Sequence, residues 1–358
     1  MIIHSVELLN FRNYEREIFH FDPETNVLFG DNAQGKTNVL EAIYLCSTTR
    51  SHKGSKDREM IRLGMDESHL RMVVKKEGID HKIDVHLKRN KSKGIAVDGI
   101  PVKRSGELLG ISNIVFFSPE DLAIIQNGPD ARRRFIDMEL CQLDKMYLFY
   151  LTKYKHVLRQ RNELLKQISI NSELMDTLDI WNSKLIEYGT YVISARKDFV
   201  EKLNGYMKDI HKSLTGDRET ISLIYEPDVW AEDFSQKLIL SEQKDLFTKT
   251  TNAGPHRDDL SFISEKKDLR KYGSRGQQRT GALSLKLTEI RIVEEKAGEK
   301  PILLLDDVLS ELDRNRQNYL LEHIKGIQTI ITCTGLEEFV KNGINIQKTF
   351  EIESGTVK

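Results

Sequence analysis

The segment from Gly30 to Thr37 constrains the fold of this chain more than any other part of it. It reads glycine, four further residues, glycine, lysine and threonine. An apolar run, 27–29, precedes it, and residues 38–45 follow with apolar side chains at helical spacing. A strand, a glycine-rich loop and a helix in this order predict a phosphate-binding loop, because glycines let a row of backbone N–H groups turn inward. The segment therefore predicts an α/β fold that binds a nucleoside triphosphate.

Each residue type in this loop has an expected chemical role. Lys36 is expected to reach the β- and γ-phosphates, and the hydroxyl of Thr37 to be a ligand of Mg²⁺. The alternative is a glycine-rich turn that binds nothing, which the flanking strand and helix disfavour. The full set of expected nucleotide contacts in the loop is Gly30, Asp31, Asn32, Ala33, Gln34, Gly35, Lys36 and Thr37.

A segment near the end of the chain supplies the carboxylates that such a loop requires. Residues 302–305 are apolar at every position, which predicts a central parallel strand that is buried on both faces. Asp306 follows at its carboxyl end, where ligands bind in open α/β sheets. We expect Asp306 to join Thr37 as a metal ligand, and Asp307 to polarise the attacking water beside Lys36. The alternative is an acid pair that merely caps a core strand.

The length of the Asp307 side chain bears on the expected rate of nucleoside triphosphate hydrolysis. This side chain is one methylene shorter than the glutamate that commonly polarises the water in such sites, so its reach is poorer. We therefore expect slow hydrolysis.

A third segment, 271–279, distinguishes between classes of phosphate-binding proteins. By itself the Ser-x-Gly-Gln turn predicts only an N-capped surface helix, and an amphipathic helix does follow over residues 282–293. Between a phosphate loop and an Asp-Asp strand, the segment resembles the signature of the ATP-binding-cassette ATPases. The resemblance implies that Ser274, Gly276 and Gln277 bind the γ-phosphate of an ATP held by a second subunit, so that ATP lies between two chains.

Further motifs narrow this resemblance to one branch. Residues 10–14, Asn-Phe-Arg-Asn-Tyr, are similar to the opening of the SMC-like branch, which implies that Arg12 and Asn13 contact the nucleotide. The Ser-Arg-Gly-Gln-Gln-Arg form of the signature is similar to the RecF family. Four other segments share that similarity, namely 117–122, 128–137, 254–259 and 306–313.

The resemblance implies a function as well as a fold. It implies an ATP-driven homodimer that binds DNA at single-strand/double-strand junctions or gaps, helps to load recombinase, and supports replication and the SOS response. Slow ATP hydrolysis would then release the DNA. The implied partners are the recombination mediator proteins RecR and RecO. The implied cofactors are ATP and Mg²⁺.

The hydrophobic pattern divides the chain into two lobes. Strand-like alternation runs to about residue 115 and returns from about residue 245. Between these points, apolar residues at helical spacing predict two long antiparallel helices, from Leu143 to Ile168 and from Leu178 to Ile210. We expect a discontinuous ATPase lobe of mixed sheet and helices, 1–115 and 245–358, with an inserted helical lobe, 116–244. The signature helix, 274–293, would pack toward the helical lobe.

This organisation weighs against three other functions. SMC proteins carry hundreds of residues of coiled coil at this place, whereas a helix of about thirty residues spans only about 45 Å, so an SMC-like architectural DNA-binding ATPase is disfavoured. In a transporter motor the signature and phosphate loop would lie closer in sequence. A small-molecule kinase would not need a signature.

Two elements of the wider cassette pattern are absent from this sequence. The glutamine that usually follows the strand before the helical lobe has no counterpart, since 118–120 reads Ser-Pro-Glu. The histidine expected after the last core strand is also missing, and Thr334 is our candidate for the γ-phosphate sensor in its place.

Charge and composition restrict where DNA could bind. The formal net charge is −1, so a DNA site must be a local patch of cations. Basic clusters occur at 50–58, 88–93, 132–134 and 159–161, and each alone is most simply a solvated face. The residues favoured for DNA contact, because they follow the phosphate loop and its helix, are Arg50, Lys53 and Lys56. Arg134 and Asp137 could instead form an internal ion pair.

Cysteine usage and hydropathy bear on the compartment. The three cysteines show no C-x-x-C spacing, which is typical of a reducing compartment and a chain without a structural metal. No apolar run approaches the roughly 18 residues that span a bilayer. We therefore expect a cytoplasmic protein with no membrane partner.

Overall fold

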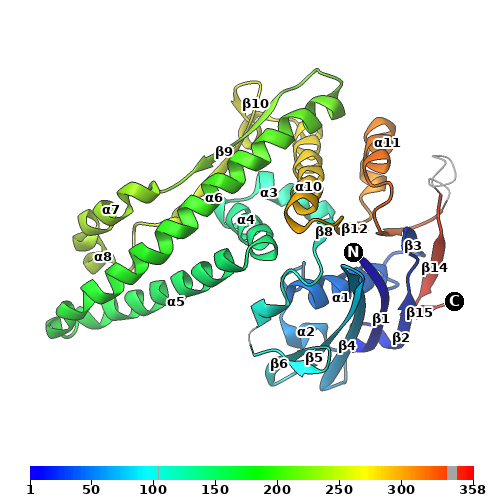
Figure 1. The fold of residues 1–358 in the computed structure, drawn as a ribbon, viewed down its shortest axis with the longest axis horizontal. Helices are drawn as coiled ribbons and strands as arrows, with labels where there is room; N and C mark the ends of the chain where they lie inside the picture. Colours follow the sequence, from blue (N-terminus) through cyan, green and yellow to red (C-terminus); the bar gives the residue numbers. More distant parts are fainter. Residues whose placement is uncertain (104, 337–344) are drawn as a thin grey trace. The chain divides into compact units, whose positions relative to one another are not determined.

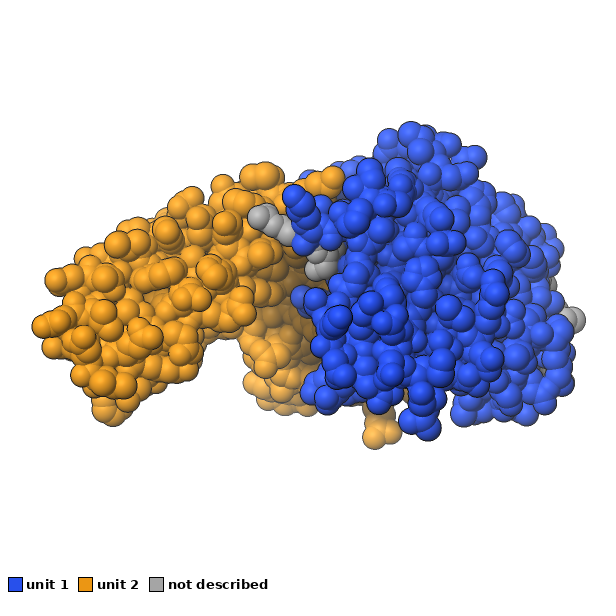
Figure 2. All heavy atoms as spheres, turned by 90° about the horizontal axis from the view of Figure 1, so that it is seen from below, with its two compact units in different colours: residues 1–121, 286–358 blue, residues 122–285 orange. Residues whose placement is uncertain are grey.

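The chain folds into two compact units, and the first of them is assembled from both ends of the chain. The computed structural model describes residues 1–103, 105–336 and 345–358. Residues 1–121 and 286–358 form the first unit, and residues 122–285 form the second (Figures 1 and 2). The fold class is confirmed, since mixed sheets and helices carry a long helical insertion.

The boundaries differ from those that the sequence predicted. The insertion begins at 122 instead of 116 and ends at 285 instead of 244. The reason for the second shift is strand pairing: β9 (Ile221–Glu226) pairs with β10 (Asp259–Ser264), and β9 packs on α6 (Leu178–Thr215). Residues 245–285 therefore belong to the helical unit. Helix α10 (Arg275–Ala297) begins in the second unit and ends in the first.

A largely parallel sheet positions the phosphate-binding loop. Its order is β15-β14-β3-β13-β12-β8, and the strands from β14 to β8 run parallel. Thr332 lies between Leu28 on one side and Asp306 on the other, so the carboxyl ends of β3, β13 and β12 meet at one edge. The strand bounds are β3 (Thr25–Phe29), β8 (Ile114–Phe117), β12 (Ile302–Asp306), β13 (Thr329–Cys333), β14 (Lys348–Glu353) and β15 (Thr356–Val357).

A second, antiparallel sheet and helix α1 (Lys36–Thr48) complete the core of this unit. The sheet has the order β2-β1-β4-β5-β6-β7. Helix α1 contacts strands of both sheets, and its apolar residues share one hydrophobic core with them. Burial between two sheets therefore fixes the helix that follows the phosphate loop. The strands are β1 (Ile2–Phe11), β2 (Tyr14–His20), β4 (Glu67–Lys76), β5 (Ile79–Lys88), β6 (Lys91–Val97) and β7 (Ile100–Pro101).

Short helices complete the first unit, and two long helices dominate the second. The short helices include α2 (Asp57–Met60) and α11 (Arg314–His323). In the second unit α5 (Lys145–Ile168) lies beside α6, which confirms the predicted helix pair (Figure 1). The remaining α-helices and strands of the second unit are α3 (Leu122–Gln126), α4 (Pro129–Leu143), α7 (Phe234–Leu240), α8 (Glu242–Thr248), α9 (Leu269–Tyr272) and β11 (Lys267–Asp268).

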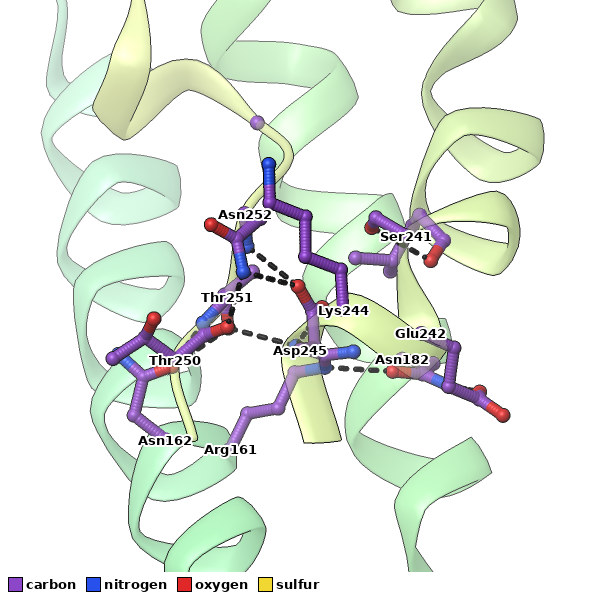
Figure 3. Close-up of polar contacts among 12 residues, drawn as sticks. Arg161, Asn162, Asn182, Ser241, Glu242, Lys244, Asp245, Thr250, Thr251 and Asn252 are labelled. Atoms are coloured by element: carbon purple, nitrogen blue, oxygen red, sulfur yellow. Dashed lines mark hydrogen bonds and ion pairs between the residues drawn. The ribbon is translucent and has the colours of Figure 1, made fainter. Parts of the chain in front are cut away.

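A buried polar cluster joins α5 and α6 to α8 and the loop after it (Figure 3). The guanidinium of Arg161 is fully buried and donates through Nε to Asn182 Oδ1 at 2.8 Å. Its Nη1 donates to Asp245 Oδ2 and to Thr251 Oγ1, each at 2.8 Å. The other oxygen of Asp245 accepts two bonds from Asn252. Arg161 is therefore a structural cation and does not belong to a solvated basic face.

The predicted ion pair between Arg134 and Asp137 is wrong. Arg134 is exposed, whereas Asp137 accepts from Arg196 Nη2 and from Lys155 Nζ, each at 2.8 Å. Burial alone would raise the pKa of Asp137, but Arg196 and Lys155 hold it below its usual value. Arg132 is also buried, against Asp259 at 2.6 Å. The arginine run of α4 therefore serves mainly to hold the second unit together.

We expect Arg161→Met to destabilise the second unit by about 3–5 kcal/mol, because it leaves Asp245 buried without its cation. Both tryptophans, Trp181 and Trp230, lie in this unit, so urea unfolding followed by tryptophan fluorescence measures its stability. Arg159→Met is the control, because Arg159 is exposed on the same helix. Equal stability of the two variants would contradict the role assigned to the cluster.

Candidate functional site

Two glycines of the phosphate loop are required by its geometry. Gly30 has φ 141° and Gly35 has φ 120°, which are values that other residues rarely adopt. A Cβ on Gly30 would lie 2.4 Å from the carbonyl oxygen of Ile352. One on Gly35 would lie 2.7 Å from Asn13 Nδ2. The loop can therefore approach its neighbours this closely only with glycine at both positions.

The loop backbone is braced from both ends of the chain. Asn13 Nδ2 donates to the carbonyl of Gln34 at 2.8 Å, and the hydroxyl of Tyr14 donates to the carbonyl of Gly35 at 3.1 Å. From the turn between β14 and β15, the backbone N–H of Gly355 also donates to the Gln34 carbonyl, at 3.0 Å. Asn13, predicted to contact the nucleotide, thus holds the loop. The contribution of the turn at 354–355 was missed, because nothing in the sequence marks that strand pair as a neighbour of the loop.

Lys36 lies inside the loop. Its ammonium donates to the carbonyl oxygens of Gly30 at 2.6 Å and Asp31 at 2.7 Å. Burial lowers the pKa of Lys36, and the carboxylates of Asp307, Asp306 and Asp31 act in the opposite direction. The side chains at 31–33 are exposed around it. A phosphate group in the loop would be a stronger acceptor for this ammonium than the two carbonyls that it now contacts.

The phosphate loop and the Asp-Asp strand meet as the sequence predicts. The hydroxyl of Thr37 donates to Asp306 Oδ1 at 2.8 Å, and the hydroxyl of Thr332 donates to the same oxygen at 2.7 Å. A hydroxyl and a carboxylate are hard oxygen donors of the kind that Mg²⁺ takes beside phosphate oxygens and water. Thr37 and Asp306 therefore fit the metal site assigned to them.

Asp307 is exposed at the end of β12, with φ 53°. Its backbone N–H donates to Thr332 Oγ1 at 3.0 Å, and its carboxylate accepts from Ser310 Oγ at 3.2 Å. Thr332 thus contacts both aspartates, a role that the sequence did not reveal, while Thr334 lies exposed beyond the end of β13. Asp307 is thus exposed to solvent, as the water-polarising role expected of it requires.

The signature residues lie in the second unit, at the start of α10. Ser274 Oγ accepts from the backbone N–H of Gln277 at 3.2 Å, and Gln277 Oε1 accepts from that of Ser274 at 3.0 Å. This reciprocal capping satisfies two backbone N–H groups, those of Ser274 and Gln277. Ser274 and Gly276 are exposed. The phosphate loop and the signature therefore belong to different units of the chain.

Arg12 is engaged by protein groups in this structure. Its Nε and Nη2 donate to the two oxygens of Glu41, each at 2.7 Å, and Nη2 also donates to Ser55 Oγ at 2.7 Å. Glu41 is fully buried on α1. Burial alone would raise the pKa of Glu41, but bonds from Arg12 and Ser51 hold it below its usual value. The candidates for DNA contact, Arg50, Lys53 and Lys56, are exposed in the segment after α1.

Comparison with known proteins identifies the family. The family model described as "RecF/RecN/SMC N terminal domain" matches residues 2–358. "DNA replication and repair protein RecF" of Lachnoclostridium phytofermentans is 58% identical over 100% of this chain and 99% of its own length. The protein of the same name from Clostridium perfringens is 43% identical over the full length of both chains. The chain belongs to the RecF family.

Solved structures agree with this assignment. A RecF structure, described as the recombination mediator protein RecF-ATP in the RecFOR pathway, superposes with a TM-score of 0.94. It is 38% identical and covers 100% of this chain and 97% of its own. An Smc head domain from Pyrococcus furiosus, with a TM-score of 0.57 and 17% identity, shares the fold. In the described part of this RecF-family chain, no helix is long and apolar enough to cross a membrane.

Thr332→Val should weaken the binding of a nucleoside triphosphate about tenfold when Mg²⁺ is present and change it little in EDTA. The reason is that the variant keeps the shape of the side chain but removes the hydroxyl that orients Asp306, at about the cost of one hydrogen bond to a charged group. Titration calorimetry with and without Mg²⁺ measures both values. Thr329→Val is the control, because that buried hydroxyl of the same strand donates to the Ile327 carbonyl. Equal losses with and without the metal would contradict the assignment.

Proposed function

We propose that this chain is an ATP-binding protein of DNA repair and recombination, in which ATP drives formation of a homodimer on DNA and slow hydrolysis releases it. The observation that carries the proposal is the contact of Thr37 with Asp306 beside the ammonium of Lys36. This is the arrangement that a triphosphate and its metal require. A RecF relative with nearly the same fold has been solved with ATP, which supports the same ligand here.

Each residue of the site would have its own role in ATP binding and hydrolysis. The N–H groups of the loop and Lys36 would hold the β- and γ-phosphates, while Thr37 and Asp306 would hold Mg²⁺. The metal, when bound, would neutralise negative charge on the phosphates. Asp307 would orient the attacking water through its exposed carboxylate. Because that side chain is short, hydrolysis would be slow, which suits a switch better than a metabolic enzyme.

The exposed signature supports an ATP-dependent dimer. Ser274 and Gly276 stand at the N-terminus of the 23-residue helix α10, where backbone N–H groups and the helix dipole favour an anion. The anion that we propose for this place is the γ-phosphate of an ATP bound to the second copy of the chain. Two ATP molecules would then join two subunits.

The names of the relatives support a proposal for the biological process in which this chain acts. RecF relatives are named as DNA replication and repair proteins, and the ATP-bound relative is placed in the RecFOR pathway. We accordingly propose that this chain acts in the cytoplasm with RecR and RecO at single-strand/double-strand junctions or gaps. There it would help to load recombinase, and it would support replication and the SOS response.

An SMC-like architectural DNA-binding ATPase is the alternative, because Smc head domains share the fold. The long helices argue against it. α5 has 24 residues and α6 has 38. At about 1.5 Å per residue, even the longer helix spans only about 57 Å. An arm of this length would not bridge distant segments of DNA.

Dimerisation should require ATP, and ADP should not replace it, because Ser274 and Gly276 would contact a phosphate that ADP lacks. Sedimentation velocity with each nucleotide measures the dimer fraction. Asp307→Asn should retain ATP binding and accumulate the dimer, since it removes the proposed water-polarising carboxylate. Ser274→Ala should leave ATP binding intact and lower the dimer fraction. A dimer of equal affinity in ADP and ATP would refute this prediction.

DNA binding should depend on ATP and strongly on salt. For a duplex, log affinity falls by roughly 0.9 for each phosphate that a cation neutralises, per unit of log salt concentration. Replacing Arg50, Lys53 and Lys56 together by alanine should make that slope shallower by up to about three units for each subunit that contacts the duplex and leave ATP binding unchanged. Anisotropy titrations of a labelled duplex over a range of salt provide the slope.

The matched control for this measurement replaces three exposed lysines of the second unit by alanine, namely Lys153, Lys184 and Lys208. It removes the same charge from the molecule. If the two triple variants have the same slope, the DNA site lies elsewhere, and the basic loop at 88–93 becomes the next candidate.

A further inference from the structure

The cations proposed to contact DNA lie on a short segment that is tied to the phosphate-loop helix. We call this segment, residues 49–56, the basic strap. Ser51 is buried, and its hydroxyl donates to Glu41 Oε1 at 2.5 Å. Ser55 Oγ, farther along the strap, accepts from Arg12 Nη2 at 2.7 Å. Since Arg12 also holds Glu41 through two bonds, the hydroxyls of Ser51 and Ser55 are joined to one ion pair, whose carboxylate is fully buried.

An aromatic contact holds the strap between these two hydroxyls. The ring of His52 lies 4.5 Å from that of Phe116 and 6.0 Å from that of Tyr44, measured between centroids. Neither ring nitrogen of His52 has a hydrogen-bond partner among the described residues. Phe116 is on β8, opposite Leu304 of the strand that ends in Asp306. The strap thus packs against α1 and against β8, the strand that pairs with the Asp306 strand.

The turn between β1 and β2 connects this anchor to the phosphate loop. Asn13 and Tyr14 bond the carbonyls of Gln34 and Gly35, as described above, and Asn13 Oδ1 accepts from Asn38 Nδ2 at 2.8 Å. The preceding residue, Arg12, has φ 53°. Its side chain donates hydrogen bonds to Glu41 and to Ser55 of the strap instead of to the loop. This two-residue turn, together with the first residue of β2, therefore contacts the loop on one side and the strap on the other.

We propose that this turn and Glu41 couple occupancy of the phosphate loop to the position of the basic strap. Glu41, Ser51 and Ser55 are then positioning residues for Arg50, Lys53 and Lys56. This inference rests on the function proposed above, in which ATP controls DNA binding, and assigns the structural link between the two sites.

The physical reason is that hydrogen bonds form an unbroken series from the phosphate loop to the strap. A phosphate in the loop would draw Lys36 away from the carbonyls of Gly30 and Asp31, which changes the loop backbone. Asn13 and Tyr14 hold that backbone directly, and Glu41 lies four residues after Thr37, on the same face of α1. Because Glu41 is fully buried and bonded to two partners, a displacement of the turn or of α1 displaces the strap as well.

The test removes only the strap's side of this link. Ser51→Ala combined with Ser55→Ala leaves Arg12 and Glu41 paired. Three quantities are measured for the full-length chain: ATP affinity, affinity for a labelled duplex with ATP, and hydrogen exchange of residues 49–56 with and without ATP in the absence of DNA. We expect ATP affinity within about twofold of the parent, and DNA affinity lower by about tenfold, because two hydrogen bonds to charged partners are lost. The exchange of the strap should no longer respond to ATP.

Two further variants separate positioning from a general loss of structure. Ser55→Ala alone changes a half-exposed side chain and should show part of the loss, and Ser55→Thr, which keeps the hydroxyl, should restore DNA affinity. Ser261→Ala is the matched control, because that hydroxyl of the second unit also donates to a carboxylate, Glu226. It should change none of the three quantities.

The results for this link and for the proposed function are distinguishable. A parent chain that fails to bind DNA in ATP would refute the proposed function, while the exchange measurement would still test the link without DNA. The link is overturned if ATP does not alter exchange of the strap in the parent chain. It is also overturned if the double variant binds DNA as the parent does, if it loses ATP affinity, or if Ser55→Thr behaves like Ser55→Ala.

Discussion

The pairing of β3 with β13, and of β13 with β12, is the constraint on which the candidate site depends. β3 lies near the start of the chain and the other two strands near its end, yet their parallel register places Gly30 and Asp306 at the same edge of one sheet. Gln328, the residue before β13, joins this sheet to β1 of the antiparallel sheet, since its buried amide bonds both the N–H and the carbonyl of Ile3. Neither half of the site exists without the other. The first unit must therefore close a long loop, whose entropic cost grows only slowly with length.

Buried arginines change how the charge of this chain should be interpreted. Arg132 and Arg161 belong to basic clusters of the sequence and Arg196 precedes a lysine, but each is nearly or fully buried and paired with aspartate. An arginine in such a place satisfies several carboxylate and carbonyl acceptors at once through its planar fork of donors. These cations organise the second unit and are not available to nucleic acid. The search for a DNA surface is accordingly narrowed to exposed cations such as those of the basic strap.

The sequence was sufficient where one local pattern determines the outcome. The strand, glycine-rich loop and helix around residues 30–37, the buried strand before Asp306 and the helices α5 and α6 were predicted correctly, because glycine spacing and apolar periodicity are local signals. The end of the insertion was placed about forty residues too early, since the pairing of β9 with β10 joins segments that are distant in sequence. The ion-pair partner of Asp137 was predicted wrongly for the same reason. Nothing near Asp137 reveals that Arg196, on another helix, is its cation.

Within the candidate site, too, the sequence predicted what depends on local motifs and missed what depends on contacts between distant segments. The identities of Lys36, Thr37 and Asp306 follow from the motif, but the part played by Thr332 depends on register between β12 and β13. Arg12 and Asn13 were recognised as important through their family motif, and only their contacts show that they brace the loop and the strap. A motif thus indicates which positions matter more reliably than it indicates whether a given residue binds the ligand or supports the residues that do.

Thr332 makes the two aspartates of the site dependent on each other. Its hydroxyl donates to the carboxylate of Asp306 and accepts from the backbone N–H of Asp307. Asp307 holds a left-handed backbone conformation, φ 53°, which costs a non-glycine residue on the order of 1 kcal/mol and persists only where surrounding contacts enforce it. The bond to Thr332 is one such contact. A shift of Asp306 on metal binding would therefore alter the support of Asp307, so the proposed metal ligand and the proposed water-polarising group would respond to the nucleotide together. Under the proposed function, this connection would make hydrolysis depend on complete assembly of the ligands, as a slow molecular switch requires.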